Sequence, residues 1–180
     1  MLNEIFGICI CGLNGSGKTT LGKALSQKTN FRHLDTEDFY FDKSNGNPYS
    51  ASRTRDQVED ILFEEIQKHP QFIFTAVNGD FGKRITPAYK LVIYLAVPLD
   101  ERMRRVKQRA LDKFGDRVLE GGDMYEQEQK FFDFCAGRSD EKIIKWIETL
   151  SCPVLFLDGT KSTDSNIEII LKQLKKMGHN

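Results

Sequence analysis

One run of eight residues has the types and the spacing that bind a polyphosphate. Gly12-Leu13-Asn14-Gly15-Ser16-Gly17-Lys18-Thr19 matches the pattern G-x-x-x-x-G-K-[ST], between an apolar run and a helical pattern. Glycines let the backbone curl so that successive N–H groups converge on one anion, and the helix that follows adds its partial positive charge. A turn that merely joins strand to helix is the alternative. The full pattern in this context predicts binding of a nucleoside triphosphate.

The side chains of this run have separate predicted roles. Lys18 is expected to reach the β- and γ-phosphate oxygens and to act in catalysis. The Thr19 hydroxyl is expected to bind Mg²⁺, which prefers oxygen ligands. The other expected contacts with the cofactor ATP come from Gly12, Asn14, Gly15, Ser16, Gly17 and Thr20.

Two carboxylates, Asp35 and Asp38, follow the second expected strand. Ligands of open α/β sheets bind beyond the carboxyl ends of the strands, so position favours a functional role. Asp35 is predicted to help hold Mg²⁺, and Asp38 is slightly favoured as the group that orients or deprotonates an acceptor hydroxyl. Helix capping is the alternative, because Asp is a common N-cap residue.

Arginines are concentrated after the fourth expected strand. Arg102, Arg105 and Arg109 recur at spacings of three and four, on one face of a helix, and Arg117 lies in a glycine-containing loop beyond it. Guanidinium groups bind phosphate oxygens, so Arg109 and Arg117 are predicted to neutralise charge during phosphoryl transfer. The segment from about 99 to 123 is expected to close as a lid. A solvated helix with acid–arginine pairs is the alternative.

Weaker candidates for substrate contacts lie in the middle of the chain. Asn78 is expected to hydrogen-bond the acceptor, although Asn78-Gly79 is equally typical of a hairpin turn. Asp80 is a candidate carboxylate near the metal. The other candidates are the aromatic residues Phe39, Tyr40 and Tyr49, which could stack on a substrate ring or lie in the core, and the arginines Arg53, Arg55 and Arg84, which are surface residues by default.

These residues need elements that bring them together. Apolar runs predict strands at 4–11, 31–35, 71–77, 90–97 and 153–157. Apolar residues at helical spacing predict helices at 18–28, 55–69, 99–113, 125–135, 141–150 and 166–177. Residues 39–54 and 114–123 are expected to be irregular. Strands that alternate with helices predict an α/β fold with a parallel sheet.

Composition limits the class of protein. The chain has 180 residues, with 26 Lys plus Arg and 26 Asp plus Glu, which favours one domain over residues 1–180 and no general nucleic-acid binding. No apolar run approaches the ~20 residues of a membrane span, and no secretory signal is expected. The four cysteines lack metal-site spacing, Cys9 and Cys11 are expected in the core, and a cytoplasmic location fits best.

The chain resembles the P-loop small-molecule kinases related to adenylate kinase. The resemblance rests on the phosphate loop 12–19, on Asp35 and Asp38, on Val97-Pro98 with the arginines that follow, and on Asp158-Gly159-Thr160. It implies a three-layer P-loop fold with a five-stranded sheet of order 2-3-1-4-5, Mg-ATP as phosphoryl donor, and a monomer or homodimer.

The resemblance also implies roles for single residues. Arg105 would lie against adenine and Arg109 would contact phosphate, while Gly159 would lie near the base. The Gly-Pro-Arg segment of nucleoside monophosphate kinases is replaced here by Asn78-Gly79-Asp80-Phe81. The expected acceptor is a nucleoside or nucleoside monophosphate. The alternatives are another hydroxylated metabolite, as in shikimate-type kinases, and a nucleotide-dependent regulatory ATPase.

Overall fold

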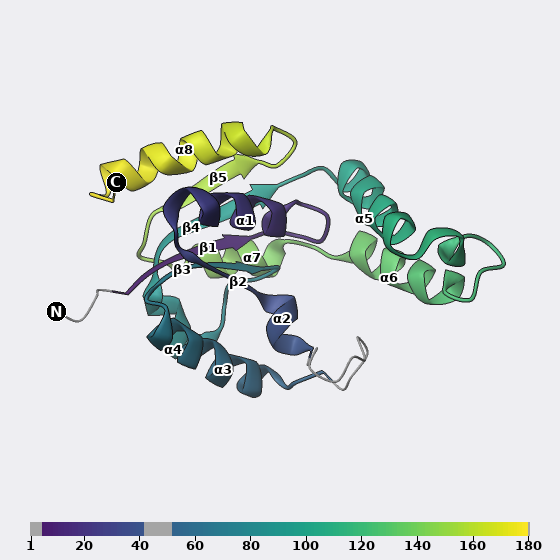
Figure 1. Ribbon diagram of the computed structural model, residues 1–180, viewed down its shortest axis with the longest axis horizontal. Helices are drawn as coiled ribbons and strands as arrows, with labels where there is room; N and C mark the ends of the chain where they lie inside the picture. Colours follow the sequence, from purple (N-terminus) through teal and green to yellow (C-terminus); the bar gives the residue numbers. More distant parts are fainter. Residues whose placement is uncertain (1–4, 42–51, 180) are drawn as a thin grey trace.

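The computed structural model describes residues 5–41 and 52–179, and a parallel sheet of five strands lies at its centre (Figure 1). The strands are β1 (Phe6–Cys11), β2 (Arg32–Asp35), β3 (Gln71–Ala76), β4 (Tyr89–Ala96) and β5 (Val154–Asp158). Their order is β2-β3-β1-β4-β5, and each neighbouring pair is parallel. The predicted fold class and strand order are confirmed.

Helices cover both faces of the sheet, which explains why the strands are apolar along their whole length. Helices α1 (Lys18–Thr29) and α8 (Thr163–Lys176) pack on one face, over Ile8 and Ile10 of β1. Helices α3 (Arg55–Lys68) and α7 (Glu141–Ile147) pack on the other face, together with Cys9 and Cys11. Side chains alternate along a strand, so β1 contributes to both apolar cores, and both cysteines are buried as predicted.

Several short elements were not predicted, because they are too short for a helical period to show. Helix α2 (Thr36–Tyr40) directly follows β2, and α4 (Gly82–Ile85) with the 3₁₀ turn η1 (Thr86–Ala88) precedes β4. Strand β3 pairs with β1 and β2 and not with β4, so Asn78-Gly79 does not form a hairpin turn. Residues 42–51 of the segment expected to be irregular, Tyr49 included, lie outside the described residues.

A helical hairpin extends from the carboxyl end of β4, beyond the edge of the sheet (Figure 1). It consists of α5 (Leu99–Phe114), the 3₁₀ turn η2 (Gly115–Val118), which interrupts the expected loop, and α6 (Tyr125–Gly137). The hairpin has an apolar cluster of its own, which includes Val106 and Phe132 and is separate from the two cores of the sheet. Of the described residues, no helix is long and apolar enough to cross a membrane.

Candidate active site

The phosphate loop connects β1 to α1 and depends on its glycines. Gly12, Gly15 and Gly17 have φ values of 149°, 83° and 96°, which L side chains rarely adopt. A Cβ atom on Gly12 would lie 2.6 Å from the carbonyl oxygen of Leu95, and one on Gly15 would contact the carbonyl oxygen of Arg102. Backbone conformation therefore favours glycine at all three positions, and lack of space also requires it at Gly12 and Gly15.

Lys18 lies at the first position of α1 and folds back across the loop. Its Nζ donates to the carbonyl oxygen of Leu13 at 3.1 Å and to Ser16 Oγ at 3.5 Å. Removal from water lowers the pKa of Lys18 from 10.5 to about 8, while the carboxylates of Asp35 and Glu37 act in the opposite direction. A triphosphate in the loop would favour the charged form of this ammonium group.

Asp35 connects the end of β2 to the phosphate loop. Its Oδ2 accepts hydrogen bonds from Thr19 Oγ1 at 2.7 Å and from Thr75 Oγ1 at 3.1 Å. Its Oδ1 accepts from the backbone N–H of Glu37 at 3.0 Å and caps α2. The structure therefore shows the capping contact at Oδ1, while Oδ2 lies beside Thr19 of the phosphate loop and the predicted Mg²⁺ role stays a prediction.

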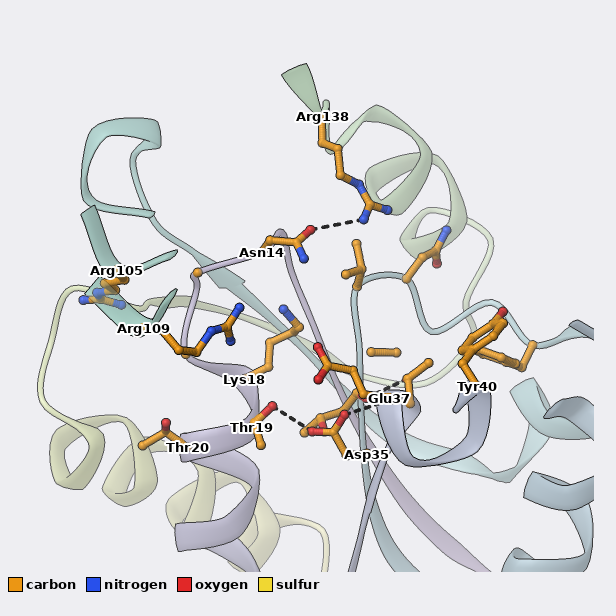
Figure 2. Close-up of a pocket in the computed structure, with 18 of the residues that line it drawn as sticks. Asn14, Lys18, Thr19, Thr20, Asp35, Glu37, Tyr40, Arg105, Arg109 and Arg138 are labelled. Carbon is orange, nitrogen blue, oxygen red and sulfur yellow. Dashed lines mark hydrogen bonds between the residues drawn. The ribbon is translucent and has the colours of Figure 1, made fainter. Parts of the chain in front are cut away.

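The Thr19 and Asp35 side chains suit a Mg²⁺ ion that is shared with a nucleotide. Their two oxygen atoms are 2.7 Å apart and lie beside the phosphate loop (Figure 2). In the described part of the chain, no group of three His, Cys, Asp or Glu residues could hold a metal ion by itself. Mg²⁺ commonly binds through one or two protein oxygens, with phosphate oxygens and water completing its octahedron, so the donor set fits this ion.

A polar chain behind Asp35 fixes the position of its carboxylate. Thr75 on β3 is 2% exposed, and its hydroxyl lies 3.1 Å from Asp35 Oδ2 and 3.1 Å from His33 Nε2. Burial lowers the pKa of His33 below its ordinary value, so this imidazole is neutral at pH 7. No role was predicted for His33 or Thr75. The position of His33 two residues before Asp35, on the same face of β2, was the available signal.

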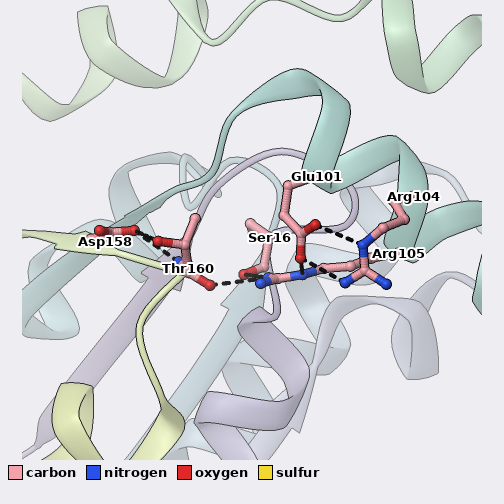
Figure 3. A network of polar contacts seen from close by, with 7 residues as sticks. Ser16, Glu101, Arg104, Arg105, Asp158 and Thr160 are labelled. Atoms are coloured by element: carbon pink, nitrogen blue, oxygen red, sulfur yellow. Dashed lines mark hydrogen bonds and ion pairs between the residues drawn. The ribbon is translucent and has the colours of Figure 1, made fainter.

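Arginines of α5 contact the phosphate loop from outside. Arg102 is only 5% exposed, and its Nη1 donates to the carbonyl oxygen of Asn14 at 3.3 Å. Arg105 Nη1 donates to the carbonyl oxygens of Gly159 at 3.0 Å and Ser16 at 3.5 Å (Figure 3). The predicted single face of arginines is therefore present, and it joins the loop to the segment after β5.

Glu101 orients the Arg105 side chain. Its Oε1 accepts from Arg105 Nε at 2.7 Å, and hydrogen bonds from Arg104 and Arg105 lower the pKa of Glu101 to about 2. Because this carboxylate stays charged at every physiological pH, it holds the guanidinium of Arg105 between the phosphate loop and Gly159.

A pocket of about 490 Å³ opens in front of the phosphate loop, between α2, the end of β3 and the helical hairpin. Its cationic side chains are Lys18, Arg55, Arg105, Arg109 and Arg138, and its acidic side chains are Asp35, Glu37 and Asp80. Arg138 Nη1 donates to Asn14 Oδ1 at 3.1 Å and closes the pocket opposite α2 (Figure 2). Such a mixture of charges can bind a polyphosphate and, beside it, a polar acceptor.

Most of the predicted site residues meet at this pocket. Asn14, Gly15, Gly17, Lys18, Thr19, Thr20, Asp35, Tyr40, Asn78, Arg105 and Arg109 line it. Gly12 and Ser16 belong to the loop itself, and Gly159 contacts Arg105 behind the loop. The parallel sheet brings these residues together, because the segments that follow the carboxyl ends of β1, β2, β3 and β5 lie at one edge.

Asp38 and Arg53 do not line this pocket, and the roles predicted for them stay predictions. They line a separate hollow beside β2 and α3, and Arg53 Nη1 donates to the carbonyl oxygen of Phe39 at 2.9 Å. Residues 37 and 40 share one face of α2, so Glu37 and Tyr40 face the pocket while Asp38 faces away. Sequence reasoning missed Glu37 as a pocket residue, because α2 has only five residues and its helical period does not show in the sequence.

Arg84 and Arg117 also lie away from the pocket. Arg84 Nη1 forms an ion pair with Asp60 at 2.6 Å, and its guanidinium lies over the ring of Phe63. Arg117 forms two hydrogen bonds with Asp123, at 2.9 and 2.7 Å, in the outer part of the helical hairpin. Neither residue lines the pocket, so the predicted substrate contact of Arg84 stays a prediction, and Arg117 would reach the pocket only if the hairpin moved.

Three comparisons relate the chain to known proteins. The protein family described as AAA domain matches residues 8–130. An "Uncharacterized protein YqaC" of Bacillus subtilis (strain 168) is 30% identical over 176 residues, which cover 93% of this chain and 96% of the relative. A shikimate kinase of Enterococcus faecalis is 26% identical over 163 residues, which cover 78% of this chain and 95% of the relative.

Solved structures show the same fold. A shikimate kinase from Bacteroides thetaiotaomicron superposes with a TM-score of 0.58 at 17% identity, and the match covers 94% of this chain and 98% of that one. A sugar kinase from Janibacter sp. HTCC2649, in an unliganded structure, gives a TM-score of 0.55 at 15% identity over 94% of both chains. At these identities the likeness concerns the fold.

Proposed function

The chain belongs to the AAA-domain family, as a P-loop small-molecule kinase related to adenylate kinase, and from this premise we propose that its acceptor is a hydroxylated ring metabolite. The observation that carries the proposal is the pocket itself. Beside the phosphate loop it holds three carboxylates and an amide, contributed by Asp35, Glu37, Asp80 and Asn78. Hydroxyl groups donate hydrogen bonds to such oxygens. The shikimate kinase and sugar kinase among the similar proteins support the same class.

The donor side of the site positions the triphosphate. The amides of the phosphate loop and the N-terminus of α1 would bind the β-phosphate, and the Lys18 ammonium would bind the β- and γ-phosphate oxygens. Thr19 and Asp35 would hold the Mg²⁺ that accompanies ATP, an ion that neutralises phosphate charge. Arg109 lines the pocket and would stabilise charge on the transferring group.

Glu37, in place of Asp38, is the carboxylate proposed to act on the acceptor hydroxyl. It lies on the face of α2 that lines the pocket, and its carboxylate is close to Lys18 (Figure 2). As the attacking oxygen bonds to the γ-phosphorus, its proton would pass to the Glu37 carboxylate, and the bond from the γ-phosphorus to the β–γ bridging oxygen would break and release ADP. Asp35 is already engaged by Thr19, Thr75 and the cap of α2, so it is less suited to accept that proton.

A nucleoside is the second candidate acceptor, because Tyr40 and Phe81 both line the pocket and an aromatic ring can stack on a base. The hairpin from α5 to α6, which includes the predicted lid at about 99–123, is proposed to close over both substrates and exclude water.

ADP release with a panel of acceptors tests these proposals. The panel contains shikimate, neutral sugars, nucleosides and nucleoside monophosphates, each with Mg-ATP, and the Lys18→Ala variant as the inactive control. We expect one hydroxylated ring compound to raise ADP release at least tenfold over the rate without acceptor. ATP hydrolysis that no acceptor stimulates would instead favour a regulatory ATPase.

A further inference from the structure

A second pocket, of about 670 Å³, lies on the other side of the segment that follows β3. Arg55, Asn78 and Asp80 line both this pocket and the one at the phosphate loop, so the two form neighbouring compartments. The remaining walls of the second pocket come from α4, η1 and α7. Nothing in the proposed transfer step uses this compartment.

Basic side chains outnumber acidic ones in the second pocket. Arg55, Lys83, Lys142 and Lys145 line it, against the single carboxylate of Asp80. Arg55 donates to the carbonyl oxygen of Asp80 and pairs with its carboxylate at 3.9 Å, and Lys145 pairs with Glu141 at 2.6 Å on the exposed side of α7. Within residues 5–41 and 52–179, Lys83 and Lys142 form no ion pair. Their charges therefore produce a positive potential that suits an anion.

Trp146 on α7 forms part of the same wall and packs against the segment between the two pockets. It is 7% exposed, and a Cβ on Gly79 would lie 2.5 Å from its ring atom Cη2. Its Nε1–H is buried and has no acceptor among the described residues, so this wall holds an uncompensated donor beside the lysines. The Trp146 ring therefore packs directly against the backbone segment that carries Asn78 and Asp80, two residues shared by both pockets.

We propose that the second pocket binds an anionic group, a carboxylate or a phosphate, carried by the acceptor at a distance from the hydroxyl that is phosphorylated. This inference rests on the proposed function, because the acceptor hydroxyl must lie in the first pocket. The shared residues Asn78 and Asp80 would contact the middle of the acceptor, and Lys83 and Lys142 would select its charged end. The acceptor is then a hydroxy acid or a sugar phosphate rather than a neutral sugar or nucleoside.

The single tryptophan of the chain gives a direct readout of this pocket. Trp146 fluorescence is titrated with two matched pairs of probes: shikimate against its neutral methyl ester, and glucose 6-phosphate against glucose. We expect a saturable change with at least one charged probe, and binding at least tenfold weaker with its neutral partner. The two pairs distinguish a carboxylate from a phosphate, and Trp146→Phe assigns the signal.

Paired lysine variants test the residues themselves. Lys83→Ala/Lys142→Ala is expected to raise the dissociation constant and the KM of the charged probe at least tenfold, and to leave ATP affinity in calorimetry unchanged. Lys172→Ala/Lys175→Ala is the control, because both lysines are exposed on α8 and their loss removes the same charge elsewhere. It is expected to change neither the dissociation constant nor the KM of the charged probe. Equal binding of charged and neutral probes, or an unchanged dissociation constant in the first variant, would overturn the proposal.

The two proposals can fail separately. Acceptor-dependent ADP release with equal KM values for a charged probe and its neutral partner would keep the kinase and remove the anion site. Charge-dependent fluorescence without any acceptor-dependent ADP release would keep a basic pocket and remove the proposed acceptor, and with it the role of this pocket in substrate selection.

Discussion

The Lys18 ammonium couples nucleotide binding to pH. In the nucleotide-free protein its pKa is about 8, below its ordinary 10.5, because it is held away from water. A bound triphosphate favours the protonated form, so above pH 8 binding requires the uptake of a proton. We expect the affinity for Mg-ATP to be flat below pH 8 and to fall above it, by up to about tenfold per pH unit. Calorimetry between pH 7 and 9.5 in buffers of different ionisation enthalpy measures both effects.

The lowered pKa of Lys18 has the opposite effect on folding stability, which it makes rise with pH. Between pH 8 and 10.5 the unfolded chain still binds the Lys18 proton that the folded protein has lost, so the free energy of unfolding rises with pH in this window. Lys18→Met is expected to remove this pH dependence of the free energy of unfolding and the pH dependence of Mg-ATP affinity. An affinity for ATP that stays constant up to pH 9.5 in the wild type would contradict this account of Lys18.

Glu37 and Asp38 are adjacent residues that face opposite sides of α2, which makes them a matched pair. Glu37→Gln removes the proposed proton acceptor while keeping shape and hydrogen-bonding capacity, and kcat is expected to fall about 10²–10⁴-fold. Asp38→Asn is expected to leave kcat within about threefold, because its side chain lines another hollow. Steady-state kinetics at saturating ATP compare the two. The reverse ranking would return the catalytic role to Asp38.

At the scale of elements, β2 and β3 would support the proposed Mg²⁺ site through Thr75. The hydroxyl of this buried residue connects Asp35 on one side to His33 on the other. Thr75→Val keeps the volume and the β-branched shape but removes the hydrogen bond. Groups that hold a metal ligand in position commonly contribute 10–100-fold in metal affinity or activity. We expect the Mg²⁺ concentration for half-maximal activity to rise about tenfold.

Thr75→Ser is the control, because it retains the hydroxyl and is expected to stay within about twofold of the wild type. Thermal unfolding of both variants separates this effect from a loss of stability. If the valine variant kept the wild-type Mg²⁺ dependence while its melting temperature fell, Thr75 would be a packing residue only.

The long elements of this fold could be predicted from the sequence, and the orientation of its short ones could not. Near-continuous apolar runs such as 90–97 require burial on both faces, which leaves few alternatives to a parallel sheet. Helix α2 has five residues, too few for a period to show which side of it meets the site. The sequence therefore favoured Asp38 over Asp35 on position in the chain alone, and Glu37 was not considered.

Residues that reach the site from distant segments were also difficult to predict. Arg138 follows α6, a helix whose place beside the phosphate loop depends on how the hairpin packs, and the second pocket forms only where α4, η1 and α7 meet. The phosphate loop was predictable because nearly all of the residues that form it lie in one short segment of the sequence.

For the whole molecule, the proposed closure of the hairpin determines what Arg117 can do. This residue pairs with Asp123 on the exposed end of the hairpin, outside the pocket. If the hairpin closes on nucleotide, Arg117→Ala lowers kcat about tenfold or more, because a charge that reaches the phosphoryl group is lost. Asp123→Ala removes only the carboxylate that pairs with Arg117 in this structure, and it is expected to change kcat less than threefold.

Hydrogen exchange with a non-hydrolysable ATP analogue measures the closure independently of activity. Amides of residues 110–130 are expected to exchange more slowly in the complex, whereas those of α3 stay unchanged. Equal exchange with and without nucleotide, together with a fully active Arg117→Ala variant, would show that the hairpin is a rigid wall.

The first two turns of α5 are attached to the phosphate loop by Arg102 and Arg105, and the Arg102 backbone lies against Gly15. The root of the hairpin is thereby anchored, and a swing of its tip must have its fulcrum further along the helix, past Arg105. Lengthening or shortening α5 by one residue beyond Arg109 would rotate the tip about the helix axis by ~100° and leave Arg102, Arg105 and Arg109 in place. Donor affinity and turnover would then be separated by a change that touches neither substrate.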